Sequence, residues 1–214
     1  MLFQPEHLFQ PSYNKTIQKM DGFYIVDNFL KNFETVQQCL YDCPHENYHM
    51  SKDGRNFKDY YDCRTFFRNV TPDENLVEER KKYFTYLINA IEEWEHHAPH
   101  WDPAFYFNIF KMGDRKLEAG KEWGQVPHVE DSINMIVYID RVCEGGTALY
   151  KKQYSIEQQE PDDALMDLTD YEYDLVEAKP NRMVLFDGNR LHGAMFNDYS
   201  KYYNEPRINM VQFF

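Results

Sequence analysis

The pattern of apolar and polar positions differs between the two halves of the chain. In the first half, residues 22–30 are rich in Phe, Tyr, Ile and Val, which is typical of a strand. Residues 31–42 follow, with Phe33, Val36 and Leu40 at helical spacing. A second helix is predicted to begin at 71–74, because Thr-Pro-Asp-Glu combines an N-cap, a proline at the first helical position and an acid at the third.

From residue 105 onward, apolar side chains alternate with polar ones in short runs bounded by turn residues. Each run is predicted to be a strand, and the runs are 105–112, 132–140, 145–152, 181–196 and 207–214. Within 132–140, Ile133, Met135, Val137 and Ile139 occupy one face, and Asn134, Ile136 and Tyr138 occupy the other.

Helices followed by a series of short strands predict a mainly β protein with N-terminal helices and a double-stranded β-helix, or jelly-roll, core. We expect a single domain over residues 1–214. Residues 1–104 would supply an N-terminal arm, a strand and supporting helices, and residues 105–214 the jelly-roll core.

Residues 153–178 interrupt the strand pattern. They contain nine Asp or Glu and no Lys or Arg. A stretch of this length without regular structure in a compact domain is usually a lid, a binding loop or a disordered excursion. We therefore expect an acidic insertion at 153–178, and selection of a basic peptide by this insertion is one hypothesis.

Composition narrows the class of protein. Aromatic residues make up 17% of the 214 residues, which indicates a folded chain with a substantial core. The net charge of −13 argues against nucleic acid or an anionic membrane as the main partner. We expect a cytoplasmic protein for three reasons. The four cysteines are scattered, the sequence shows no secretory leader pattern, and it has no apolar run of about 18 residues. The oligomeric state is left open.

The candidate chemistry lies in the sequence Pro-His-Val-Glu-Asp at residues 127–131. His128 and Glu130 are two positions apart, so in an extended segment both side chains point the same way. Asp131 would point away, although the choice between Glu130 and Asp131 as a ligand stays open. His192 follows a later strand. Two histidines and one carboxylate that leave positions open form the facial triad of non-haem Fe(II) oxygenases.

Four segments, in this order, resemble the core of Fe(II)- and 2-oxoglutarate-dependent dioxygenases, nearest to the prolyl-4-hydroxylase-like group. They are PHVEDSINMIVYID, EGGTALYKK, NRMVLFDGNRLHGA and RINMVQFF. The resemblance implies that His128, Glu130 and His192 hold the iron. It also implies that Arg207 pairs with the distal carboxylate of 2-oxoglutarate and that Tyr138 donates a hydrogen bond to it. By alternation, Asn209 and Val211 share the face of Arg207 and are expected to line the pocket.

The resemblance implies an enzyme that uses O₂ to couple oxidative decarboxylation of 2-oxoglutarate to hydroxylation of a substrate C–H bond. The substrate would be a small molecule or peptide, for example a prolyl or other amino-acid residue. Three features depart from the family: Glu130 stands where aspartate is usual, 15 positions separate His192 from Arg207, and Lys111 stands where relatives commonly have a tyrosine. The alternatives are a non-catalytic jelly-roll scaffold and a cupin-type metalloenzyme that does not use 2-oxoglutarate.

Overall fold

The structure is a computed structural model, and it describes residues 11–12, 15, 17–42, 63–66, 78–79, 82, 106–110, 127–153, 172–202 and 204–214. At 63–66, 106–110, 152–153 and 199 the description covers the backbone alone. No helix formed by these residues is long and apolar enough to cross a membrane.

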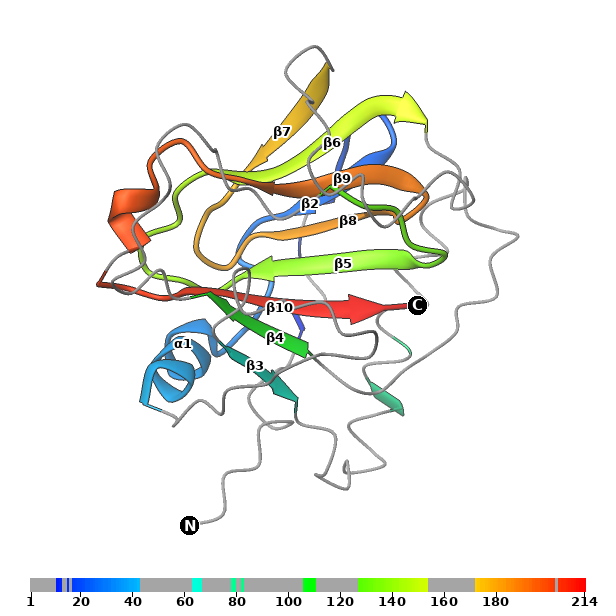
Figure 1. Ribbon diagram of the computed structural model, residues 1–214. Helices are drawn as coiled ribbons and strands as arrows, with labels where there is room; N and C mark the ends of the chain where they lie inside the picture. Colours follow the sequence, from blue (N-terminus) through cyan, green and yellow to red (C-terminus); the bar gives the residue numbers. More distant parts are fainter. Residues whose placement is uncertain are drawn as a thin grey trace.

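Two antiparallel sheets form the body of the protein (Figure 1). The larger sheet has seven strands, in the order β1 (Gln18–Lys19), β2 (Phe23–Val26), β8 (Met183–Asp187), β5 (Ile133–Tyr138), β10 (Arg207–Phe213), β4 (Tyr106–Phe110) and β3 (Cys63–Phe66). The smaller sheet has the order β7 (Tyr173–Glu177), β6 (Gly146–Gln153) and β9 (Arg190–Met195). A mostly β fold with two facing antiparallel sheets agrees with the predicted jelly-roll core.

One face of the larger sheet packs against helix α1 (Phe33–Asp42). Phe33, Val36 and Leu40, the residues at helical spacing, are the buried residues of α1. Alternate residues of the central strands meet them in one apolar cluster, which includes Ile133, Met135, Val137, Met183, Leu185, Ile208 and Met210. Side chains alternate along a strand, so this cluster uses only every second position.

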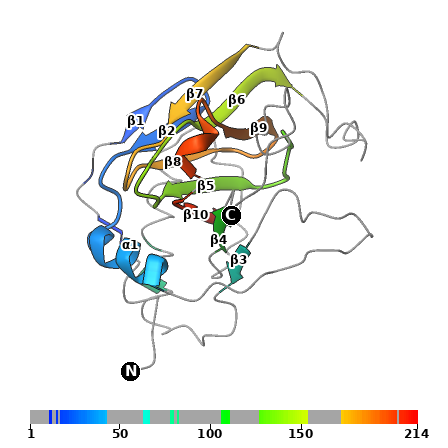
Figure 2. The ribbon, with the colours of Figure 1, turned by 60° about the vertical axis from the view of Figure 1, so that its left-hand side comes forward.

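The opposite face of the larger sheet lies toward the smaller sheet, and Figure 2 shows α1 and the smaller sheet on opposite sides of β8 and β5. A second apolar cluster fills part of this space, with Phe23, Val184 and Phe186 from the larger sheet and Leu149 and Val176 from the smaller one. The remaining space between the sheets is lined by both polar and apolar side chains of β5, β6, β9 and β10.

The prediction of more than one N-terminal helix is not supported. Among the described residues α1 is the only complete α-helix, and a short 3₁₀ helix, η6 (Tyr199–Tyr202), lies in the C-terminal half. The helix predicted to begin at 71–74 lies outside the described residues, apart from the helical positions 78–79 and 82.

The predicted acidic insertion at 153–178 is wrong in its last part, because residues 173–177 form strand β7. This strand pairs with β6 from Gly146 opposite Glu177 to Tyr150 opposite Tyr173. Only Val176 of β7 is fully buried. A strand at the edge of a sheet carries charged side chains that discourage pairing with other chains, so its composition is easily mistaken for that of a loop.

Candidate metal centre

Backbone pairing brings the Pro-His-Val-Glu-Asp segment beside strand β9. The amide of His128 donates to the carbonyl of His192 at 2.9 Å, and the amide of His192 donates back at 3.0 Å. One step further along, the amide of Glu130 donates to the carbonyl of Gly188 at 2.8 Å. The two histidines therefore face each other across a short antiparallel bridge, although 64 positions separate them in the sequence.

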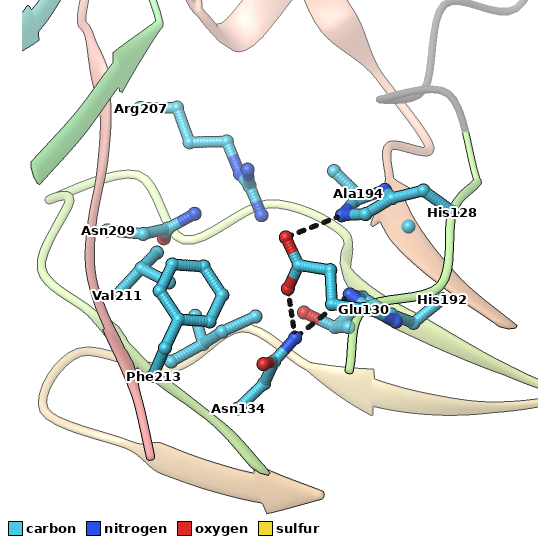
Figure 3. A pocket seen from close by; sticks show the side chains of 12 residues that line it. His128, Glu130, Asn134, His192, Ala194, Arg207, Asn209, Val211 and Phe213 are labelled. Atoms are coloured by element: carbon cyan, nitrogen blue, oxygen red, sulfur yellow. Dashed lines mark hydrogen bonds and ion pairs between the residues drawn. The ribbon is translucent and has the colours of Figure 1, made fainter. Parts of the chain in front are cut away.

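Three side chains that can ligate a metal converge at this bridge. His128, Glu130 and His192 each offer a donor atom, and these atoms lie within 4.8 Å of one another. His128 Nε2 is 3.7 Å from Glu130 Oε1, and the two imidazole ring centroids are 4.4 Å apart. Figure 3 shows the three side chains pointing toward one another. Asp131 is exposed and is not part of this group, so the structure brings Glu130 to the histidines.

His192 is held in the form that a metal ligand requires. The residue is 4% exposed, and its Nδ1 lies 2.8 Å from the backbone carbonyl of Arg190. A carbonyl only accepts, so Nδ1 carries the hydrogen and Nε2 keeps its lone pair for the site. Burial, together with the neighbouring His128, lowers the pKa of His192 to about 3. The ring is therefore neutral, and neutral imidazole is the form that binds a metal.

A residue that sequence reasoning did not single out, Asn134 on β5, touches two of the three candidate ligands. Its Nδ2 donates to Glu130 Oε2 at 2.5 Å and lies 3.3 Å from His192 Nε2. The available signal was a lone amide on the inward face of an otherwise apolar strand, in phase with Glu130 by period two.

Arg207, at the start of β10, is a buried cation beside these side chains. It is 7% exposed, and its Nε has no hydrogen-bond partner. One Nη reaches the carbonyl of Gly146 at 3.4 Å, and the guanidinium lies 5.0 Å from the centre of the Phe196 ring. With the Asn209 amide oxygen turned toward Arg207, this oxygen accepts from Nη1 at 2.9 Å. No carboxylate among the described residues forms an ion pair with Arg207.

A single pocket contains the three candidate ligands and Arg207. The pocket and the open solvent at its mouth together span about 500 Å³. Its wall is completed by Asn134, Ile136, Thr147, Gly193, Ala194, Asn209, Val211 and Phe213. Asn209 and Val211 therefore line the pocket, as alternation from Arg207 predicts (Figure 3). A buried guanidinium that lines a pocket and has one N–H without a hydrogen-bond partner is suited to binding an anionic ligand.

Tyr138 lies behind the wall of this pocket, not in it. The side chain is fully buried, and its hydroxyl donates to Thr147 Oγ1 at 2.7 Å. Burial raises the pKa of Tyr138 to about 12. Thr147, which sequence reasoning did not single out, presents the hydroxyl that lines the pocket at this point.

Several solved structures are similar to this chain. The non-haem, alpha-ketoglutarate-dependent carbocyclase SnoK of nogalamycin biosynthesis is 10% identical, with a TM-score of 0.49 over 90% of this chain and 79% of that one. A prolyl hydroxylase from Trichoplax adhaerens, in complex with a peptide fragment of hypoxia inducible factor, is 15% identical, with a TM-score of 0.49 over 91% and 84%.

NgTET1, in complex with 5mC DNA, is 12% identical, with a TM-score of 0.42 over 90% of this chain and 71% of that one. The expectation that nucleic acid is not a partner stays a prediction. No family model and no curated protein match the sequence. The function of this chain is therefore argued from the side chains of its own pocket.

Proposed function

We propose that this protein is an Fe(II)- and 2-oxoglutarate-dependent dioxygenase that hydroxylates a C–H bond of its substrate. The observation that carries the proposal is that one pocket holds His128, Glu130 and His192 together with the buried guanidinium of Arg207, whose Nε has no hydrogen-bond partner.

The three donor groups suit Fe(II). Imidazole and carboxylate are ligands that this ion accepts, and three donors from one side leave its other positions open. When bound, the iron would supply O₂ activation, with 2-oxoglutarate as the reducing cosubstrate. His192 brings a neutral ring whose orientation is held by the Arg190 carbonyl, and Glu130 brings the negative charge. With Glu130 as the third ligand, hydroxylation is favoured over halogenation, because a halide would need that position.

Arg207 would bind the distal carboxylate of 2-oxoglutarate. A guanidinium forms two parallel hydrogen bonds with a carboxylate, and its charge offsets that of the ligand. The Asn209 amide steadies one edge of the guanidinium, while Nε remains to be satisfied. Because Tyr138 hydrogen bonds to Thr147, its proposed role is to orient the Thr147 hydroxyl at the pocket wall.

The substrate would be an aliphatic group of a small molecule or peptide, with a prolyl or other amino-acid residue as the first choice to test. Ile136, Val211 and Phe213 give the pocket an apolar wall, which would exclude water from the reacting C–H bond. Among the described residues that line the pocket, Glu130 is the one acidic residue and Arg207 the one arginine, and both already have a proposed role.

The first test uses the purified protein under anaerobic conditions. Addition of Fe(II) and 2-oxoglutarate is expected to give a weak visible charge-transfer band, and admission of air should yield succinate. His192→Ala and Glu130→Ala should each abolish both signals while circular dichroism shows a folded protein. Asp131→Ala is the matched control and should retain them. Full succinate production in both ligand variants would refute the proposal, and a wild-type protein without the band would favour a scaffold.

Substrate identity is tested separately. Amino acids, prolyl peptides and a cell lysate are incubated with the enzyme, Fe(II), 2-oxoglutarate and O₂, and mass spectrometry searches for a product heavier by one oxygen. Its amount should match the succinate formed above the uncoupled background. A product that also forms with His192→Ala would not be due to this site.

A further inference from the structure

We propose that Asn134 is a positioning residue that holds Glu130 as a metal ligand through one carboxylate oxygen. This inference rests on the proposed metal centre. It adds a residue that is not itself a ligand but holds one of the ligands in place. Asn134 would touch neither substrate nor cosubstrate, and it would act through Glu130.

The contacts of Asn134 divide the two oxygens of Glu130 between two tasks. The Asn134 amide donates to Oε2 at 2.5 Å, whereas Oε1 is the oxygen that lies 3.7 Å from His128 Nε2. An oxygen already bound by an amide donor is less available to a metal ion, so Oε1 is left as the ligand. Figure 3 shows Asn134 on the side of Glu130 away from His128.

The amide itself is firmly oriented. Asn134 is 2% exposed, and its Oδ1 accepts a hydrogen bond from Ser132 Oγ at 2.7 Å, which leaves Nδ2 facing Glu130. The backbone at Gly188 packs closely against Ser132, Glu130 and Asn134. A Cβ added at Gly188 would lie 2.5 Å from the Ser132 carbonyl, 2.7 Å from that of Glu130 and 3.2 Å from Asn134 Oδ1. The close approach of this turn therefore depends on glycine and keeps Asn134 in register with Glu130.

A glutamate needs such support more than an aspartate does. Its extra methylene adds a rotatable bond, and fixing that bond costs conformational entropy when the ligand binds a metal. The hydrogen bond from Asn134 fixes the carboxylate before the metal arrives. Partners of this kind behind a metal ligand typically change metal affinity by about 10- to 100-fold.

The same amide also lies 3.3 Å from His192 Nε2, the atom whose lone pair would bind the metal. A lone pair cannot serve both groups. Metal binding is therefore expected to break the contact between Asn134 and His192 and to keep the one between Asn134 and Glu130. In the metal-free protein, Asn134 would hold two of the three ligands close to their binding positions.

The test measures Co(II) affinity of the full chain by visible absorption without 2-oxoglutarate, so that turnover is not the readout. Co²⁺ lies next to Fe²⁺ in the affinity series and accepts the same ligands. Asn134→Ala and Asn134→Leu, the second of similar size, should weaken Co(II) binding by about 10- to 100-fold. Ser132→Ala should weaken it less. Asn189→Ala, which removes an exposed amide on the neighbouring turn, should leave it unchanged.

A double-mutant cycle separates positioning from general damage to the fold. In Glu130→Asp the shorter carboxylate can no longer reach the Asn134 amide. Adding Asn134→Ala to Glu130→Asp should therefore change Co(II) affinity by only about twofold or less, the range expected for residues that do not interact. If Asn134→Ala costs as much with Glu130→Asp as it does alone, the positioning role is overturned.

The outcomes distinguish this inference from the proposed function. If Glu130→Ala leaves Co(II) affinity unchanged, the metal centre itself is wrong. If Glu130→Ala weakens Co(II) binding and both Asn134 variants bind as the wild type does, only the positioning role is wrong. Should Asn134→Ala not fold, as judged by the metal-free melting temperature, Asn134→Leu and Ser132→Ala decide by the same measurement.

Discussion

The two faces of the larger sheet differ sharply, although the same strands build both. On the face toward α1, the central strands place apolar side chains, among them Met135, Leu185 and Met210. On the face toward the smaller sheet, β5 and β10 place Asn134, Arg207 and Asn209, which are also buried. Both faces therefore bury side chains at these positions, and the two faces differ in the chemistry of what they bury.

This difference separates stability from function. Burial of apolar side chains stabilises the fold, whereas burial of a cation or an amide costs free energy unless hydrogen bonds compensate. The unfilled Nε of Arg207 shows that compensation is incomplete on the pocket face. Natural proteins accept such local losses at functional sites. Substitutions at neighbouring positions of one strand should therefore differ in effect. A substitution on the face toward α1 should lower the free energy of unfolding, and one on the pocket face should weaken ligand binding.

The largest effect is expected at Arg207. Arg207→Ala should raise the KM for 2-oxoglutarate by roughly 30-fold or more, because loss of one partner of a buried charge pair costs about 2–5 kcal/mol. The free energy of unfolding should change little or rise, since an incompletely bonded buried cation is removed. Initial rates of succinate formation and urea denaturation give the two values.

Arg141→Ala, at an exposed arginine on the far side of the sheet, is the control for Arg207. An unchanged KM for 2-oxoglutarate in Arg207→Ala would mean that the cosubstrate is anchored elsewhere or is not used, as in a cupin-type metalloenzyme.

The next effect concerns the face toward α1. Leu185 on β8 is 1% exposed within the apolar cluster. Leu185→Ala should lower the free energy of unfolding by about 3 kcal/mol, through lost burial and the cavity left behind. The KM for 2-oxoglutarate of the folded protein should stay the same. Urea denaturation measures the first value, and a large rise in KM would show that the two faces are not independent.

The smallest effect is expected at an ion pair at the end of β2, away from the pocket. Arg182 donates to both carboxylate oxygens of Asp27, at 2.6 and 3.0 Å, and these hydrogen bonds lower the pKa of Asp27 from 3.8. A lowered pKa stabilises the folded state above pH 3.8, and the contribution is lost as the pH falls through the lowered value.

Asp27→Asn tests this pair. The Asp27 side chain is 41% exposed, so the pair is worth about 0.2–1 kcal/mol at neutral pH. The free energy of unfolding of the variant should fall by that amount at neutral pH, and the difference should shrink below pH 3.8. Denaturation curves across this range measure it. A difference that grows as the pH falls would contradict the assigned sign.

Much of the fold follows from periodicity. The period of two in residues 132–140 correctly assigns both faces of β5, and the helical spacing of Phe33, Val36 and Leu40 correctly identifies the buried side of α1. Strand β7 was missed because an edge strand needs few buried positions, and its acidic side chains resemble those of a loop.

The residue types of the candidate site were determined by the sequence alone. Period two placed His128 and Glu130 on one face of an extended segment, and the order of four segments that resemble a known family singled out His192 and Arg207. Only the tertiary structure decided which of them meet. Contacts across 64 positions depend on how strands pair, and that pairing places Glu130 beside the histidines, leaves Asp131 exposed, puts Tyr138 behind Thr147 and turns Asn134 toward Glu130.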